Sequence, residues 1–195
     1  MDRDLELQLV ARLRAGDPDA FDALYDALHG RVFNFLARLS NSREVAEDLS
    51  EETWLRLVTH AQRLRPDTRV AAWLFTVARN LYTSYYRSRL LEDAHATELL
   101  GLWPGGSPQR TPLEAVEANE AQRQIARALA ALPAGHREAL LLVGVEGLSP
   151  ADAAAACGIS PEAMRQRLCR ARALLARRLE DDTRTPLRSL REVTS

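Results

Sequence analysis

Apolar residues recur along the chain with the spacing of amphipathic helices, and no run alternates with a period of two. Leu, Ala, Glu and Arg dominate while Val and Ile are sparse, which favours helix over strand. The sequence therefore predicts an all-α protein. Gly, Pro and Asn at residues 16–18, 40–41 and 65–67 separate four expected helices, which cover Leu5–Ala15, Pro18–Leu39, Ser42–Arg63 and Val70–Leu91.

A segment rich in Gly and Pro divides the chain, because residues 92–112 hold more helix breakers than a helix or a strand tolerates. We expect a helical bundle over residues 1–91, this flexible linker over 92–112, a second helical domain over 113–180 and a polar, frayed tail over 181–195. Within the linker, Leu99–Trp103 is unusually apolar, and we expect it to pack on a partner or on the protein itself. Full exposure of Trp103 in fluorescence measurements, both in the free protein and in the complex with its partner, would contradict that expectation.

The most specific local pattern is a helix-turn-helix over residues 148–178. Ser149, Pro150 and Asp152 combine an N-cap, a proline in the first turn and an acidic capping-box partner, so a short helix begins there. Gly158 can end it in the left-handed conformation, and Ser160 followed by proline starts a longer second helix by the same device. In such units the second helix can enter the major groove of DNA.

The second helix of this unit has one apolar face and one basic face. Met164, Leu168, Ala171 and Leu175 form the predicted buried stripe. Arg and Gln suit contacts with base edges and phosphates, although an Arg-rich face can also be merely solvated. The residues on the opposite face and at its border are Glu162, Arg165, Gln166, Cys169, Arg170, Arg172, Arg177 and Arg178.

The charge pattern supports a DNA-binding C-terminal domain. The net charge of −1 from 26 basic and 27 acidic residues, every basic one being Arg, would by itself discourage nucleic acid as a partner. Residues 91–120, however, carry a net charge of −5 and residues 121–195 a net charge of +4. The two Cys have no metal-ligand spacing, the N-terminus lacks a signal-peptide pattern and no stretch approaches 18 apolar residues. These features predict an intracellular protein.

Two faces of the N-terminal bundle are candidates for binding. Over residues 42–63, Asp48, Glu51 and Glu52 lie opposite the apolar stripe with Leu55 among them, and this face is either a protein-docking patch or simply solvated. Over residues 70–91, Trp73 lies outside the apolar stripe together with Arg79, Asn80 and Arg87. That combination suits single-stranded DNA, whereas a structural role for the Trp is the alternative.

Taken together, these segments resemble the extracytoplasmic-function (ECF) group of bacterial RNA polymerase sigma factors. AGDPDAFDALYDAL resembles sigma region 2.1, REVAEDLSEETWLRL region 2.2, and RVAAWLFTVARNLYTSYYRSR regions 2.3 and 2.4. The sequence from Ala131 to Leu175 is similar to region 4, so the resemblance covers about residues 5–180. It implies a promoter-specificity subunit that uses region 2 to recognise and open the minus-ten element and region 4 to recognise the minus-thirty-five element.

The resemblance also implies partners and site residues. The β′ clamp helices of core RNA polymerase would bind Asp48, Glu51, Glu52 and Leu55, and the β flap is a second expected contact. An anti-sigma partner is plausible, and neither a cofactor, a metal nor membrane insertion is expected. The minus-ten residues would be Arg63, Arg65, Asp67, Thr68, Arg69, Trp73, Arg79, Asn80 and Arg87, and the minus-thirty-five residues Ser160, Glu162, Arg165, Gln166, Arg167, Cys169, Arg170 and Arg172.

Two other functions remain as alternatives. A helix-turn-helix repressor or activator would act without docking on polymerase, and such proteins usually bind palindromic DNA as dimers. A di-iron helical bundle needs paired Glu-x-x-His elements, and this sequence offers only Glu92–His95. The resemblance favours a cytoplasmic sigma factor that is not itself an enzyme, since the polymerase performs the chemistry.

Overall fold

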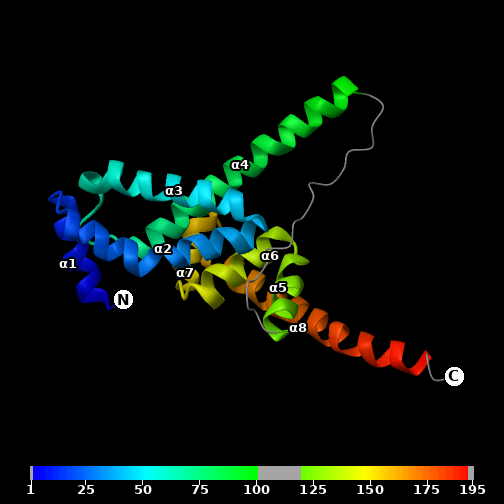
Figure 1. The fold of residues 1–195 in the computed structure, drawn as a ribbon. Helices are drawn as coiled ribbons and strands as arrows, with labels where there is room; N and C mark the ends of the chain where they lie inside the picture. Colours follow the sequence, from blue (N-terminus) through cyan, green and yellow to red (C-terminus); the bar gives the residue numbers. More distant parts are fainter. Residues whose placement is uncertain (1, 101–119, 193–195) are drawn as a thin grey trace. The chain divides into compact units, whose positions relative to one another are not determined.

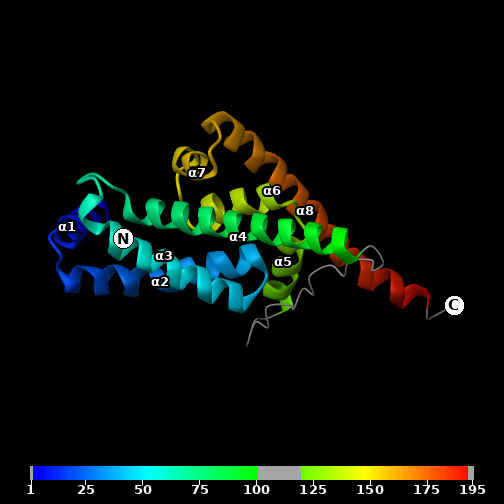
Figure 2. The same cartoon turned by 90° about the horizontal axis from the view of Figure 1, so that it is seen from above.

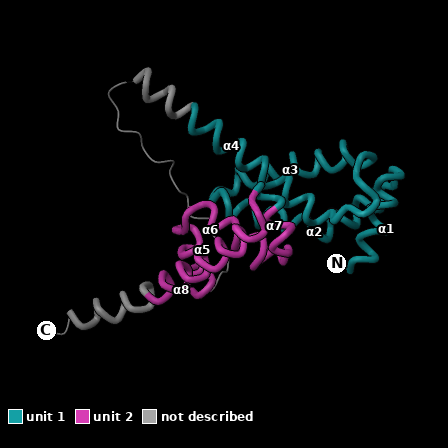
Figure 3. The backbone as a smooth tube through the Cα atoms, turned by 180° about the vertical axis from the view of Figure 1, so that it is seen from behind, with its two compact units in different colours: residues 1–113, 155–158 teal, residues 114–154, 159–195 magenta. Residues whose placement is uncertain are grey.

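A computed structural model describes residues 2–100 and 120–192, with side chains over 2–91 and 120–180. These residues form helices and no strands, which confirms the predicted all-α class. They belong to two compact units: residues 1–113 together with 155–158, and residues 114–154 together with 159–195 (Figure 3). The linker segment over residues 101–119, and with it Trp103, lies outside the described residues.

The first unit is built from α1 (Arg3–Arg14), α2 (Pro18–Ser40), α3 (Arg43–His60), the short 3-10 helix η1 (Ala61–Arg63) and α4 (Val70–Leu100). Helices α2, α3 and the first half of α4 pack side by side (Figures 1 and 2). The breaks between the first three helices are the predicted ones, because Gly16 (φ 84°) and Asn41 (φ 57°) adopt left-handed conformations and Asp17 and Ser42 cap the following helices.

The core of the first unit is formed by the faces that periodicity predicts. On α3 the stripe Ala46, Leu49, Thr53 and Leu57 is buried. On α4, Leu74, Ala78 and Leu81 are buried, whereas Val77 and Tyr85 are only partly so. Phe75 is fully buried as well, and its ring meets that of Phe35 edge-on at 5.4 Å between centroids.

Two helices extend further than the sequence analysis predicts. Helix α4 continues to Leu100 rather than ending at Leu91, because residues 92–100 are mostly good helix formers and the first breaker is Gly101. Helix α8 (Pro161–Glu192) likewise includes most of the tail that we expected to be frayed (Figure 1). The side chains of residues 92–100 and 181–192, His95 included, lie outside the described set.

The second unit contains α5 (Glu120–Ala130), α6 (Ala134–Ala139), the π-helical turn η2 (Leu140–Val145), the first part of α7 (Pro150–Cys157) and α8, while residues 155–157 of α7 are grouped with the first unit. Gly144 lies within η2, which ends at Val145, and Gly147 adopts a left-handed conformation (φ 69°) in the turn that follows. Leu132, Leu140 and Ala171 are buried together, and Leu129, Leu174 and Leu175 pack against them. Helix α8 therefore contributes the face predicted to be apolar, with Met164 and Leu168 also buried.

The buried guanidinium of Arg137 joins α5 to α6. It donates hydrogen bonds to the carbonyl oxygens of Leu129 at 3.1 Å and Leu132 at 3.2 Å, and to that of Ala130. Carbonyls at a helix C-terminus have no partner within the helix, so this side chain satisfies groups that would otherwise be buried without a hydrogen bond. Arg137 thus fixes the turn on which the second unit is built.

Replacing Arg137 with Met should destabilise the second unit by about 2–3 kcal/mol, because charge-assisted hydrogen bonds to carbonyls are lost while the apolar stem is kept. Urea denaturation followed by far-ultraviolet circular dichroism measures the change. Arg127→Met is the matched control, since Arg127 lies on α5 in an exposed ion pair with Glu120. Equal destabilisation by the two substitutions would contradict the role given to Arg137.

Candidate functional site

The α3 face is defined here as Asp48, Glu51, Glu52 and Leu55, the residues predicted to dock on a protein partner. Asp48, Glu51 and Leu55 are exposed and Glu52 is half-buried, on the opposite side of α3 from its buried stripe. Leu55 is 57% exposed. A large apolar side chain surrounded by carboxylates is an arrangement that a partner with an apolar pocket and basic rim would complement.

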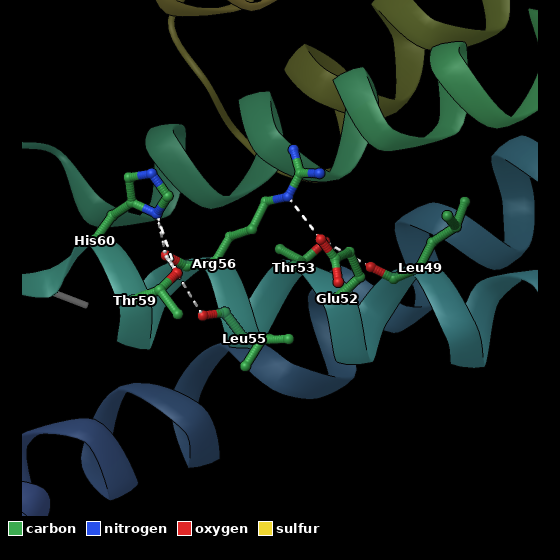
Figure 4. Close-up of polar contacts among 7 residues, drawn as sticks. All are labelled: Leu49, Glu52, Thr53, Leu55, Arg56, Thr59 and His60. Carbon is green, nitrogen blue, oxygen red and sulfur yellow. Dashed lines mark hydrogen bonds and ion pairs between the residues drawn. The ribbon is translucent and has the colours of Figure 1, made fainter.

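The hydrogen bonds of α3 determine which carboxylates on this face are available (Figure 4). Glu52 accepts from Arg56 Nε at 2.8 Å, one helical turn further on. Asp48 and Glu51 make no ion pair with any side chain in the described ranges 2–91 and 120–180. Because an exposed pair at i,i+4 contributes only about 0.3–0.5 kcal/mol, a partner's basic group can readily replace Arg56 at Glu52.

Sequence reasoning missed one residue of this face, Val58, which is 53% exposed. Val58 lies three residues after Leu55, so the two side chains are neighbours on the helix surface. The face therefore has an apolar pair rather than a single Leu. The signal was present in the sequence, since Val58 falls outside the stripe that periodicity assigns to the core.

The predicted minus-ten residues lie at the end of η1 (Arg63), on the segment that joins η1 to α4, and on α4 itself. Arg63, Arg65, Asp67 and Arg69 are exposed and Thr68 is half-buried. Arg65 and Asp67 form an ion pair at 3.2 Å, and the Thr68 amide donates to the carbonyl of Arg65 at 3.0 Å, closing a turn. The segment is therefore a short, structured loop with several charged side chains on its surface.

On α4 the predicted aromatic and polar residues are not equally exposed. Asn80 and Arg87 are exposed, whereas Trp73 and Arg79 are half-buried. The Trp73 ring lies 6.4 Å from that of His60 between centroids, and Arg79 donates to the Asn80 side-chain oxygen at 3.3 Å. Trp73 thus has both a structural contact and an accessible part. This arrangement is compatible with a structural role and with contact to single-stranded DNA, the two roles considered from the sequence.

The capping pattern predicted for the helix-turn-helix is confirmed. Ser149 Oγ accepts from the Asp152 amide at 3.1 Å and donates to the Asp152 carboxylate at 2.6 Å. Gly158 has φ of 65°, and Ser160 Oγ accepts from the Ala163 amide at 3.1 Å. Ser160 therefore acts first as the cap that starts α8.

The α8 face, defined as the eight predicted minus-thirty-five residues, is mostly exposed: Ser160, Glu162, Arg165, Gln166, Cys169, Arg170 and Arg172. Arg165 donates to Glu162 Oε2 at 2.7 and 3.1 Å, and Gln166 donates to Glu162 Oε1 at 3.4 Å. The Arg165 guanidinium holds the pKa of the Glu162 carboxyl below its usual value, with Gln166 adding to the effect. One ionised carboxylate thus orients the two side chains best suited to base edges.

Arg167 differs from the rest of the α8 face. It is half-buried and lies 3.9 Å from the carboxylate of buried Glu138 on α6, with its guanidinium packed beside Gly135. The Arg167 side chain is therefore directed toward α6. Both cysteines are free thiols; Cys157 is buried, while Cys169 lies exposed on the α8 face.

Comparison with known proteins identifies the class. Residues 24–90 match the family described as Sigma-70 region 2, and residues 122–175 match Sigma-70, region 4. Two helical units with these two regions define a sigma factor of bacterial RNA polymerase.

The comparisons also give the group within that class. The chain is 38% identical to "ECF RNA polymerase sigma factor EcfG" of Rhodopseudomonas palustris, over 73% of this chain and 75% of that protein. It is 35% identical to "RNA polymerase sigma factor CarQ" of Myxococcus xanthus, over 81% and 88% of the two chains. Sigma factor RpoE from Bartonella quintana, solved with the anti-sigma factor NepR, is structurally similar (TM-score 0.66, 28% identity, 82% and 96% covered).

The chain belongs to the ECF RNA polymerase sigma factors. It functions in promoter recognition and transcription initiation, and it binds core RNA polymerase and promoter DNA. Within the described part of the chain, no helix combines the length and the apolar character needed to cross a bilayer. No group of three potential metal ligands occurs among those residues either.

Proposed function

We propose that the α3 face, extended by Val58, is the surface that binds the clamp helices of the polymerase β′ subunit. The single observation that carries this proposal is the exposed pair Leu55 and Val58 bordered by Asp48 and Glu51. Burying the pair would supply the apolar part of the interface, while the carboxylates would accelerate association with a basic partner. Glu52 would exchange Arg56 for a basic group of the polymerase.

We further propose that the loop of residues 64–69 and the exposed side of α4 bind the minus-ten element. Exposed Arg63, Arg65, Arg69 and Arg87 suit contacts with phosphates. The accessible part of Trp73, together with the exposed Asn80 on the same helix, suits contact with a base that has left the stack. Extraction of a base costs a few kcal/mol, and contacts of this kind must offset that cost. Asp67, Thr68 and Arg79 would shape this surface.

The α8 face is proposed to recognise the minus-thirty-five element. Arg165 and Gln166, oriented by Glu162, would contact base edges, while Arg170 and Arg172 would contact phosphates and Ser160 and Cys169 would lie at the margins. Arg167, which is directed toward Glu138, would contribute mainly by positioning α8. The second unit would in addition contact the β flap.

Three broader features complete the proposal. The chain would have no catalytic activity of its own and would act in the cytoplasm, where core polymerase is found. An anti-sigma factor would hold it inactive, an inference supported by the complex of the related RpoE with NepR. Co-purification of the tagged chain followed by mass spectrometry would identify such a partner.

In vitro transcription tests the function directly. Core RNA polymerase with the chain should give promoter-dependent transcripts from a genomic fragment library, whereas neither component alone should do so. The chain alone should bind double-stranded DNA weakly and without preference, unlike a dimeric repressor. Specific binding to a palindrome in the absence of polymerase would overturn the proposal.

A further inference from the structure

Arg3 and Glu6 of α1 contact the loop of residues 64–69, which we assign to the minus-ten element, and the start of α4. About 65 residues of sequence separate α1 from these two segments. Arg3 Nη2 donates to the carbonyl of Asp67 at 2.8 Å, and Arg3 Nη1 lies 3.5 Å from the carbonyl of Thr68. The same Nη1 donates to Glu6 Oε2 at 2.8 Å. The other oxygen of Glu6 accepts from the Ala71 amide at 3.1 Å.

These contacts form a continuous connection from the loop to the first turn of α4. Glu6 is buried, only 7% exposed, and its carboxylate accepts from one of the α4 amides that have no partner within the helix. A negative charge is also favourable at a helix N-terminus. Arg3 balances the buried charge and binds the loop carbonyls, so each residue depends on the other.

The contacts from Arg3 and Glu6 add to those that the loop makes at its two ends and within itself. The Leu64 amide donates to the carbonyl of Ala61, the Trp73 amide donates to the carbonyl of Arg69, and the turn from Arg65 to Thr68 closes between them. The exposed Arg65–Asp67 ion pair contributes little, so Arg3 supplies the side-chain hydrogen bonds to the carbonyls of residues 67 and 68. A loop that fluctuates must be ordered when it binds, and that ordering weakens the complex. Small displacements of binding groups also have large effects on their interactions.

We propose that Arg3 and Glu6 are positioning residues for minus-ten recognition: they fix the backbone of residues 67–71 in the free protein and so pre-organise the loop and the turn that leads to Trp73. The proposal rests on the assignment of this loop to the minus-ten element. Both residues precede the segment, residues 24–90, that matches Sigma-70 region 2. The match therefore does not assign them a role.

Hydrogen exchange of the free protein tests the positioning step without reference to DNA. Arg3→Met should raise the exchange rate of the Ala71 amide by about 10-fold or more, the equivalent of one lost charge-assisted hydrogen bond. Glu6→Gln keeps an oxygen for that amide and should give a smaller rise. Arg12→Met is the matched control, because Arg12 is exposed on the same helix and pairs with Asp17 rather than with the loop carbonyls that Arg3 binds.

Transcription then tests the consequence for recognition. On a promoter obtained by in vitro selection with holoenzyme, the ratio of transcripts from the intact to a scrambled minus-ten element should fall about 10-fold in Arg3→Met, at saturating sigma factor. Arg12→Met should leave the ratio unchanged. Arg3→Lys, which keeps the positive charge but replaces the planar guanidinium with a single ammonium group, should retain part of the ratio that Arg3→Met loses. A general loss of stability would lower both transcripts without changing their ratio.

Three outcomes separate the proposals. Unchanged Ala71 exchange in Arg3→Met and Glu6→Gln, with α2 amides still protected, would overturn the positioning role. A normal transcript ratio despite faster exchange would overturn it as well, provided that Trp73→Ala and Asn80→Ala lower the ratio. If those two substitutions also leave the ratio unchanged, the assignment of the minus-ten surface itself is wrong.

Discussion

Leu55→Ala is expected to weaken the binding of this sigma factor to core RNA polymerase by about 10-fold, a loss of about 1.4 kcal/mol. Leu55 is 57% exposed in the free protein, so truncation removes little packing inside the bundle. The effect should therefore appear in the complex and not in the stability of the free chain. Fluorescence anisotropy of labelled sigma factor titrated with core polymerase measures the change.

The chain offers a matched control for this experiment. Leu5 on α1 is 48% exposed, and Leu5→Ala removes the same atoms from a surface outside the α3 face. Val58→Ala should have a smaller effect in the same direction. Asp48→Ala with Glu51→Ala should slow association and reduce its salt dependence, because carboxylates at an interface rim act mainly on the association rate. Unchanged affinity of Leu55→Ala would refute the assignment of the α3 face.

Features governed by neighbouring residues were predictable from the sequence. Gly158 and Ser160 mark the turn before α8, and Asn41 ends α2, because backbone conformation at these positions depends on the residue's own side chain. The exposure of Leu55 and the burial of Met164 followed from helical periodicity. These are local properties, and the structure confirms each of them.

Contacts between distant segments could not be predicted in the same way. Nothing in the spacing of Arg3 or Glu6 indicates that they reach residues 67–71, and an Arg on a recognition helix looks equally suited to DNA whether or not Glu138 is nearby. The buried role of Arg137 was hidden for the same reason, since it satisfies carbonyls exposed by a particular turn. Helix packing decides such contacts, and periodicity does not specify it.

The paired carboxylates and guanidinium groups limit how tightly a chain of net charge −1 can bind DNA without the polymerase. Glu162 partly neutralises Arg165 and Glu138 lies beside Arg167, so the free α8 face is less positive than its Arg content indicates. Binding of the chain alone to DNA should accordingly be weak, because non-specific affinity depends on phosphate neutralisation. Specific recognition would then require the polymerase to hold both sigma regions on the promoter.

Arg165→Ala is expected to reduce discrimination at one base pair of the minus-thirty-five element by about 10-fold to 100-fold, as one bidentate contact with a base accounts for about 1–3 kcal/mol. Other positions of the element should keep their preferences. Selection of promoter sequences by holoenzyme, followed by sequencing, measures the preference at every position at once. Arg177→Ala is the matched control, because Arg177 is also exposed on α8 but lies twelve residues, about 18 Å, further along the helix.

Glu162→Ala distinguishes a side chain that orients Arg165 from a bystander. If the two bonds from Arg165 to Glu162 place the guanidinium for base contact, loss of the carboxylate should relax the same base position, and the double substitution should add little to Arg165→Ala. If Glu162 instead accepts from a cytosine, its removal should relax a different position and the effects should add.

The lowered pKa of Glu162 also predicts how this contact depends on pH. The carboxylate stays ionised at and above the ordinary pKa of a Glu side chain, and it loses its pairing with Arg165 only when the pH falls below that ordinary pKa. Transcription near neutral pH should therefore be insensitive to the titration of Glu162. If Arg177→Ala relaxed the base preference as much as Arg165→Ala does, neither contact would be base-specific.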